Sequence, residues 1–216
     1  MGIIQDQDRI AIKKQFENLS SPVKLINFTQ EIECQYCKET HQLINELSEL
    51  SDKISAESYN FITDKEATEK FKIEQIPATV IMGDEDKGIR YYGIPGGYEF
   101  AALMDAIKMV SDGNSGLSPQ TKDFLKQLKQ PVDLKVFVTP TCPHCPRSVS
   151  LAFRMAMESP LVTAAGIEAI EFPHLANKYS VQGVPRTVIN DKIPLEGAYP
   201  EPMVVEAIKK ALGYDA

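Results

Sequence analysis

The cysteines are the residues of this sequence best able to do chemistry. All four stand in two C-x-x-C pairs, Cys34/Cys37 and Cys142/Cys145. Two cysteines at this spacing form a dithiol that can close into a disulfide, exchange with other disulfides or bind a metal. Four cysteines in 216 residues are too few for a disulfide scaffold, so the pairs predict redox or metal chemistry.

A second motif repeats in step with the cysteines. Pro77 lies in Ile-Pro-Ala-Thr-Val and Pro185 in Val-Pro-Arg-Thr-Val, and each proline follows the first cysteine of its pair by 43 residues. Two motifs that keep one separation in both halves of the chain indicate an internal duplication of about 108 residues, a common domain size. A stretch rich in Gly, Ser, Asn and Pro at 111–119 favours two domains, 1–115 and 116–216.

The same order of strand and helix patterns is expected in both halves. Short apolar runs before each cysteine pair and after each proline predict buried strands. Apolar residues at helical spacing after each pair, and at both ends of each half, predict amphipathic helices. The predicted strands cover 23–28, 78–82, 132–138 and 187–189, and the predicted helices cover 9–16, 43–50, 100–107, 122–129, 149–157 and 204–212. Strands that alternate with helices predict an α/β protein.

Each cysteine pair is expected to open a helix directly after a strand. The first N–H groups of a helix lack partners and its N-terminal end carries partial positive charge, so a thiolate is stabilised there. Cys34 and Cys142, as the more exposed members, are predicted nucleophiles. Cys37 and Cys145, one turn further in, are predicted resolving thiols that attack a mixed disulfide and release the product.

The two prolines fit the same chemistry. An X-Pro bond takes the cis form at little cost, and a cis proline offers a flat face without an N–H group. We expect Pro77 and Pro185 to lie against the sulfur pairs. The backbone groups of the preceding residues, Ile76 and Val184, would then be free to pair with an extended substrate segment.

With these motifs the whole chain resembles the thermophilic protein disulfide oxidoreductases, a tandem-thioredoxin family also called glutaredoxin-like. The resemblance covers both cysteine pairs, both prolines and the stretch from Tyr92 to Phe100. It implies an α/β fold of two tandem thioredoxin-like domains, each a central mixed β-sheet flanked by helices. It also implies a cytoplasmic enzyme that reduces, oxidises and isomerises protein disulfides without a cofactor or metal, and that a thioredoxin reductase recharges.

The sequence departs from thioredoxins at one position. Thioredoxins have an acidic residue on the first central strand that moves protons near the second cysteine, whereas the aligned residues here are Asn27 and Val136. Glu168 and Glu171, in a strand expected at 167–172, are alternative acids. Their simpler interpretation is a partly solvated strand face.

The surroundings of the two pairs differ. Gln35-Tyr36 stands inside the first pair, among three glutamates and one lysine, and Pro143-His144 stands inside the second, with Arg147 behind it. Negative neighbours disfavour a thiolate and positive ones favour it. We therefore predict a lower pKa for Cys142 than for Cys34, and a more oxidising second pair.

Two residues inside the pairs are candidates for tuning these thiols. His144 can stabilise the Cys142 thiolate, while Tyr36 could pack against substrate or only shield the sulfurs. Pro146 would be the fifth residue of a helix that begins at Cys142, where it could kink that helix.

Composition excludes several classes of protein. The net charge of −7 argues against nucleic-acid binding, and no apolar run approaches the roughly 18 residues of a membrane span. The N-terminal residues lack the apolar core of a signal peptide, which favours the cytoplasm.

Two alternatives remain open. One is a dedicated electron donor for a peroxide reductase, although the resemblance implies that such modules keep a single working cysteine pair. The other is a structural metal-binding protein. Zinc sites built from two C-x-x-C pairs usually place the pairs 15–20 residues apart, whereas 104 residues separate Cys37 from Cys142.

Overall fold

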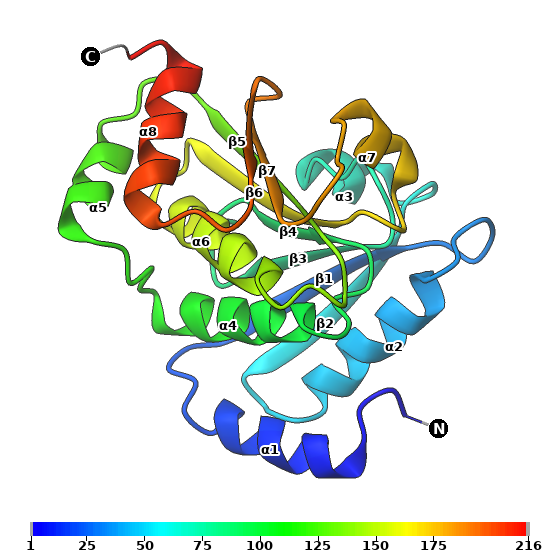
Figure 1. Ribbon diagram of the computed structural model, residues 1–216. Coiled ribbons are helices and arrows are strands. Elements are labelled where there is room, and N and C mark those ends of the chain that lie inside the picture. The colour runs from blue at the N-terminus through cyan, green and yellow to red at the C-terminus, as the bar shows by residue number, and fades with distance from the viewer. Residues whose placement is uncertain (1, 215–216) are drawn as a thin grey trace.

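A computed structural model describes residues 2–214 as one eight-stranded sheet with helices on both faces (Figure 1). The strands are β1 (Val23–Thr29), β2 (Ile54–Asn60), β3 (Ala78–Met82), β4 (Ile89–Tyr92), β5 (Val132–Val138), β6 (Val162–Glu168), β7 (Arg186–Ile189) and β8 (Ile193–Glu196). The helices are α1 (Asp6–Phe16), α2 (Cys37–Ser48), α3 (Lys65–Lys70), α4 (Glu99–Asp112), α5 (Pro119–Lys126), α6 (Cys145–Glu158), α7 (Pro173–Lys178) and α8 (Glu201–Leu212). Within residues 2–214 no helix is long and apolar enough to cross a membrane.

The element order repeats. The elements from α1 to α4 are, in order, a helix, a strand, a helix, a strand, a helix, two strands and a helix. The elements from α5 to α8 follow the same order. The α/β class and the duplication of the fold are thus confirmed. The connection between α4 and α5 runs through 113–118, while the domain limits of 1–115 and 116–216 stay a prediction.

The two units share one sheet, which the sequence did not predict. The strand order is β2-β1-β3-β4-β6-β5-β7-β8, and the parallel pair β4 and β6 joins the halves. Tyr91 on β4 lies opposite Gly166 on β6, and a β-carbon at Gly166 would stand 2.8 Å from the Tyr91 ring. The small residue therefore leaves room for the tyrosine at the junction.

Two apolar layers hold the sheet between the helices. One face carries Leu25, Ile81 and Leu134 against α1, α2, α4, α5, α6 and α8. The other face carries Phe28, Phe137 and their neighbours against α3, α7 and the adjoining loops, as Figure 1 shows. Burial of such aliphatic and aromatic side chains, at roughly 1.5–3 kcal/mol each, is the main stabilising term.

Both cysteine pairs lie at the same end of the sheet. β3 runs antiparallel to β1, β4 antiparallel to β3, β6 parallel to β4, and β5 parallel to β6. The carboxyl ends of β1 and β5, which precede the two pairs, therefore point the same way. Four strand spacings of about 4.8 Å separate β1 from β5, so the sites stand about 19 Å apart.

The helix starts differ slightly from expectation. α2 and α6 begin at Cys37 and Cys145, so the first cysteine of each pair lies in the preceding loop. Pro146 is consequently in the first turn of α6, where its missing N–H would have had no partner. The helical hydrogen bond that Pro146 would remove from a helix beginning at Cys142 is therefore not lost.

Candidate active sites

The N-terminal site is an accessible disulfide at the start of α2. Cys34 and Cys37 are bonded with a sulfur–sulfur distance of 2.03 Å, and their Cα atoms lie 5.5 Å apart. Cys34 is half-buried, whereas only 1% of Cys37 is exposed. An incoming thiolate can therefore reach Cys34 and not Cys37. This favours Cys34 as the nucleophile when the pair is reduced and as the sulfur that is attacked when the pair is oxidised.

The C-terminal site repeats this arrangement with a more enclosed disulfide. Cys142 and Cys145 are bonded at the start of α6, again with Cα atoms 5.5 Å apart. Cys142 is 9% exposed and Cys145 is fully buried. The Cys142 sulfur lies 3.7 Å from the carbonyl oxygen of Val184, so the proline segment is in contact with this site.

Both candidate prolines have cis peptide bonds, as the sequence led us to expect. They are the Ile76–Pro77 and Val184–Pro185 bonds, which directly precede β3 and β7. Each proline is buried, and Ile76 and Val184 are half-buried at the end of the sheet that carries the cysteines. The segments are therefore placed where an extended peptide could align with them.

The residues between the cysteines occupy matching positions. Tyr36 and His144 are the N-cap residues of α2 and α6, and neither side chain forms a capping hydrogen bond. Gln35 donates a hydrogen bond of 3.3 Å to the Tyr36 hydroxyl, while His144 is exposed. The roles predicted for Tyr36 and His144 in tuning the thiols stay predictions.

No acid occupies the position next to the N-terminal site that thioredoxins use. Asn27 on β1 is fully buried and donates a hydrogen bond of 3.2 Å to the carbonyl oxygen of Ala78. Its amide oxygen has no partner, and neither does the buried hydroxyl of Thr79 on the neighbouring strand. This position is thus polar but cannot exchange protons at neutral pH.

The C-terminal site has a buried group of acids nearby that the sequence only partly predicted. It consists of Glu99, Glu168 and Glu171 with the hydroxyl of Tyr91. Glu99 is fully buried and both of its carboxyl oxygens lack partners. Burial raises the pKa of Glu99 to about 8 and that of Glu171 to about 7. The pKa of Glu168 is also raised by burial.

Two expectations about these acids were wrong. Glu168 is 2% exposed at the end of β6, so it does not belong to a solvated strand face. Glu171 lies beyond the strand, because β6 ends at Glu168 and a turn follows. The Glu168 carboxylate accepts a hydrogen bond of 2.6 Å from the backbone N–H of Glu171, and this bond holds the turn.

The acids belong to the C-terminal site although Glu99 comes from the other half of the chain. The backbone N–H of Tyr98, next to Glu99, donates a 2.9 Å hydrogen bond to the carbonyl oxygen of Pro140, two residues before Cys142. α4, which Glu99 begins, packs along α6, which Cys145 begins. Sequence analysis missed Glu99, because its burial depends on contact between the two halves. The only indication in the sequence was that Glu99 lies in the stretch from Tyr92 to Phe100, which is part of the family resemblance.

The two cysteine pairs lie at separate places in the sheet. They follow β1 and β5, strands that are four spacings or about 19 Å apart, and each pair is closed as a disulfide within its own motif. Across residues 2–214, no group of three or more His, Cys, Asp or Glu side chains is placed to hold a metal.

Known proteins resemble both the halves and the whole. The model of a thioredoxin domain family matches residues 132–210. A thioredoxin from Methanocaldococcus jannaschii is 38% identical over 82 residues, which are 38% of this chain and 96% of that protein. Over the whole length, a protein disulfide oxidoreductase from Aeropyrum pernix superposes with a TM-score of 0.92 and 28% identity, covering 99% of this chain and 96% of the other.

Some relatives are much longer proteins. This chain spans 28% of a Bacillus subtilis protein described as NADH dehydrogenase, at 25% identity over 153 residues or 71% of the chain.

The structure of an alkylhydroperoxide reductase protein, AhpF, from Enterococcus faecalis superposes with a TM-score of 0.86 and 25% identity, covering 94% of this chain and 98% of that one.

Proposed function

Because the chain belongs to the thioredoxin family, in its two-domain protein disulfide oxidoreductase form, we propose that it exchanges disulfides with proteins at two sites. One observation carries the proposal. Both C-x-x-C pairs close as disulfides at the start of a helix, and in each the first cysteine is less buried than the second.

The reaction uses the two cysteines of a pair in sequence. The thiolate of Cys34 or Cys142 attacks a substrate disulfide, forms a mixed disulfide and releases one substrate thiol. The second cysteine, Cys37 or Cys145, then loses its proton, attacks the first sulfur and releases the other thiol. Two electrons leave the pair, which ends as a disulfide, and the reverse sequence oxidises a substrate dithiol. Isomerisation combines both directions on one substrate.

We assign proton transfer at the C-terminal site to Glu99. The resolving thiol Cys145 is fully buried, so water cannot readily take its proton. Glu99 begins the helix that packs on α6, and its buried carboxyl oxygens have no hydrogen-bond partner. A carboxyl with a pKa of about 8 gains and loses protons near neutral pH, which suits a general acid or base.

Pro77 and Pro185 are assigned to substrate binding with Ile76 and Val184. These segments lie at the end of the sheet that carries the sulfurs, and the carbonyl oxygen of Val184 is close to Cys142. A substrate strand that pairs with the backbone of Ile76 or Val184 would bring its disulfide to the exposed cysteine, without a demand on substrate sequence.

The partners are proteins that contain thiols or disulfides, and we propose a reductase of the thioredoxin reductase type as the electron donor. The proposed location is the cytoplasm. A coupled assay with such a reductase and its nicotinamide cofactor tests the donor directly: oxidation of the nicotinamide should require this protein and at least one intact cysteine pair.

A site-resolved redox titration tests the function itself. The protein is equilibrated across glutathione or dithiothreitol buffers, its thiols are trapped by alkylation, and each C-x-x-C peptide is quantified by mass spectrometry. Reversible cycling of both pairs is expected. Pairs that resist oxidation and alkylation until a chelator is added would contradict the proposal and favour metal binding.

A second candidate is an electron donor to a peroxide reductase. The structural likeness to the alkylhydroperoxide reductase protein from Enterococcus faecalis favours it. The second intact pair argues for the broader activity, because a dedicated donor needs one pair only. Replacing Cys34 and Cys37 by serine separates the candidates: a dedicated donor would keep its full activity, whereas an oxidoreductase with two working sites would lose part of it.

A further inference from the structure

The two sites cannot exchange electrons directly within one molecule. They stand about 19 Å apart at one end of a single continuous sheet, whereas disulfide exchange requires the sulfurs to touch. No hinge separates them, because β4 and β6 pair over four residues. Electrons that enter one site therefore reach the other only through a second protein molecule.

The loop before Cys34 protrudes and is acidic. Ile32 is 76% exposed, one of the most exposed large apolar side chains of residues 2–214. Glu31 and Glu33 flank it, are exposed, and take part in none of the ion pairs found within those residues. An exposed isoleucine between two unpaired carboxylates is suited to a groove with apolar walls and cationic edges.

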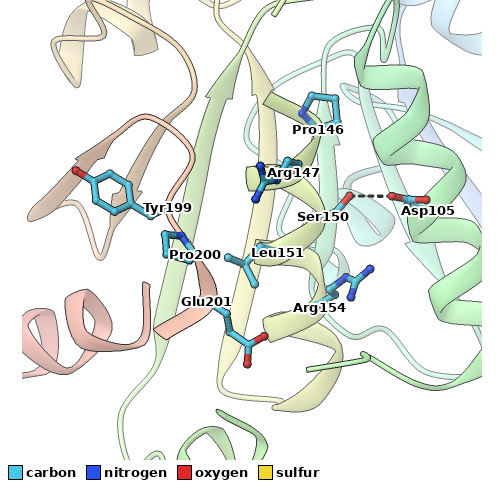
Figure 2. Close-up of a pocket in the computed structure, with 9 residues that line it drawn as sticks. All are labelled: Asp105, Pro146, Arg147, Ser150, Leu151, Arg154, Tyr199, Pro200 and Glu201. Carbon is cyan, nitrogen blue, oxygen red and sulfur yellow. Dashed lines mark hydrogen bonds between the residues drawn. The ribbon is translucent and has the colours of Figure 1, made fainter. Parts of the chain in front are cut away.

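Such a groove lies beside the C-terminal site. It has a volume of about 320 Å³, and Figure 2 shows its lining on α4, on α6 and on the segment that enters α8. Leu151, Tyr199 and Pro200 supply apolar surface, and Pro146 brings the groove next to Cys145. An isoleucine side chain is small enough for this volume.

The two arginines of the groove form no ion pair. Arg147 and Arg154 are exposed and stand within 4 Å of no carboxylate in the described part of the chain, although Arg154 contributes to the lowered pKa of Glu201. The two acidic lining residues keep their charge but are hydrogen-bonded to neutral groups. Glu201 accepts hydrogen bonds from the backbone and the hydroxyl of Ser118, and Asp105 accepts one from Ser150, drawn in Figure 2.

We propose that this groove receives the loop Glu31–Glu33 of a second copy of this chain, and that the two kinds of site exchange electrons between molecules. Ile32 would enter between Leu151 and Tyr199, with the flanking carboxylates near the two arginines. Cys34 follows Ile32 by two residues, a reach of about 7 Å, so docking brings it towards Cys142. The inference rests on the proposed function of both pairs.

The exchange balances without an outside reagent. The Cys34 thiolate of one molecule attacks the Cys142 sulfur of an oxidised partner copy, and the Cys142–Cys145 bond breaks. The Cys37 thiol then gives up its proton and attacks Cys34, which releases the partner's Cys142. One disulfide and one dithiol thus change places, with two electrons and two protons transferred.

Two variants isolate the transfer. In one, Cys34 and Cys37 are serine and the remaining pair is oxidised; in the other, Cys142 and Cys145 are serine and the remaining pair is reduced. After mixing, alkylation and mass spectrometry follow each pair with time. We expect a second-order transfer.

Substitutions that reverse the charge on either surface test the docking. Arg154→Glu in the first variant or Glu31→Lys in the second should each slow transfer about fivefold to tenfold, and the two together should recover most of the rate. Ile32→Ser should slow it by a similar factor. The matched control is Lys126→Glu on α5, which leaves the rate unchanged. Each variant is also assayed with a neutral peptide disulfide, and the rates between copies are normalised to that value.

The outcomes separate the two proposals. If both pairs exchange with the peptide but transfer between copies is absent or insensitive to the charge changes, docking between copies is wrong and the oxidoreductase function stands. If Arg154→Glu slows exchange with acidic peptide disulfides and not between copies, the groove serves an acidic client and the inference is overturned. If neither pair exchanges with the peptide, the proposed function itself fails.

Discussion

The two sites share their backbone plan and differ in the titratable groups around them. Each has a disulfide at a helix start, a first cysteine less buried than the second, and a cis proline directly before a strand. At the N-terminal site the neighbouring strand position holds Asn27, which cannot act as an acid. At the C-terminal site a buried carboxyl, Glu99, comes from the other half of the chain.

This difference shows what fusion of two units adds to the fold. A single thioredoxin-like unit has to supply such an acid itself. Here the acid near the C-terminal pair, Glu99, lies on α4, which is the last helix of the N-terminal unit. The same contact buries Glu168 and half-buries Glu171, so the acids depend on the junction between the halves. The N-terminal site does not adjoin this junction and has the amide of Asn27 on the neighbouring strand instead.

Removing the attacking cysteines should give the largest effects and test whether the sites are independent. Cys142→Ser is expected to abolish exchange at the C-terminal pair and leave the N-terminal pair active, and Cys34→Ser the reverse, because the sulfurs are too far apart to replace one another. Exchange with a neutral peptide disulfide, resolved by site, measures this. Silencing of both sites by one substitution would contradict independence.

Glu99→Gln should slow the C-terminal site by about a hundredfold near pH 7, since general acid–base catalysis typically contributes 10²–10⁴-fold. The N-terminal rate should not change. The pH profile distinguishes a role in proton transfer from a structural one: a rate step near pH 8 in the native protein should vanish in the variant. Glu99→Asp should restore part of the step.

The buried acids should also make folding stability depend on pH. Their pKa values are higher in the folded protein than in the unfolded chain, so the folded state binds more protons between pH 4.5 and 8. The free energy of unfolding should therefore fall as pH rises through this window, by about 2 kcal/mol or more. Urea unfolding at pH 5 and pH 9 measures the fall, and Glu99→Gln should make it smaller.

Asn27→Asp places an acid beside the N-terminal pair and makes the sites more alike. A buried carboxyl without full hydrogen bonding costs about 1–3 kcal/mol of stability, so a lower melting temperature is expected. Exchange at Cys34 and Cys37 should gain a pH dependence that the native site lacks. An unchanged pH profile in a folded variant would show that this position does not communicate with the sulfurs.

The smallest expected difference lies in the pKa values of the attacking thiols. Charge in the flanking residues predicts a lower pKa for Cys142 than for Cys34, by about one unit. Alkylation rates measured against pH in the two single-site proteins give both values, and His144→Ala should narrow the gap. A lower pKa for Cys34 would show that burial of Cys142 outweighs its positive neighbours.

Features with a local cause could be predicted from the sequence. The strands before the cysteines, the helices after them and the placement of both prolines follow from apolar spacing and motif repetition, and the structure contains all of them. The helices α2 and α6 begin three residues later than the sequence predicted, because the first cysteine of each pair remains in the loop.

Features that depend on contact between the halves could not be predicted. Nothing in the pattern of β4 or β6 specifies that they pair with each other, and Glu99 resembles any acidic residue at the first turn of a helix. For the same reason Glu168 looked like part of a solvated strand. Its burial follows from the segment around Gly93, whose β-carbon, if present, would stand 2.8 Å from the β-carbon of Glu168.

The parallel pairing of β4 with β6 also limits how this protein can be divided. The continuous sheet has two outer strands, β2 and β8, where two separate units would have four. Cutting the chain between the halves would uncover Ile89–Tyr92 on one piece and Val162–Glu168 on the other, both almost entirely buried in the intact protein. Unpaired apolar strands of this kind recruit other strands, so each half alone should aggregate unless its new edge is covered.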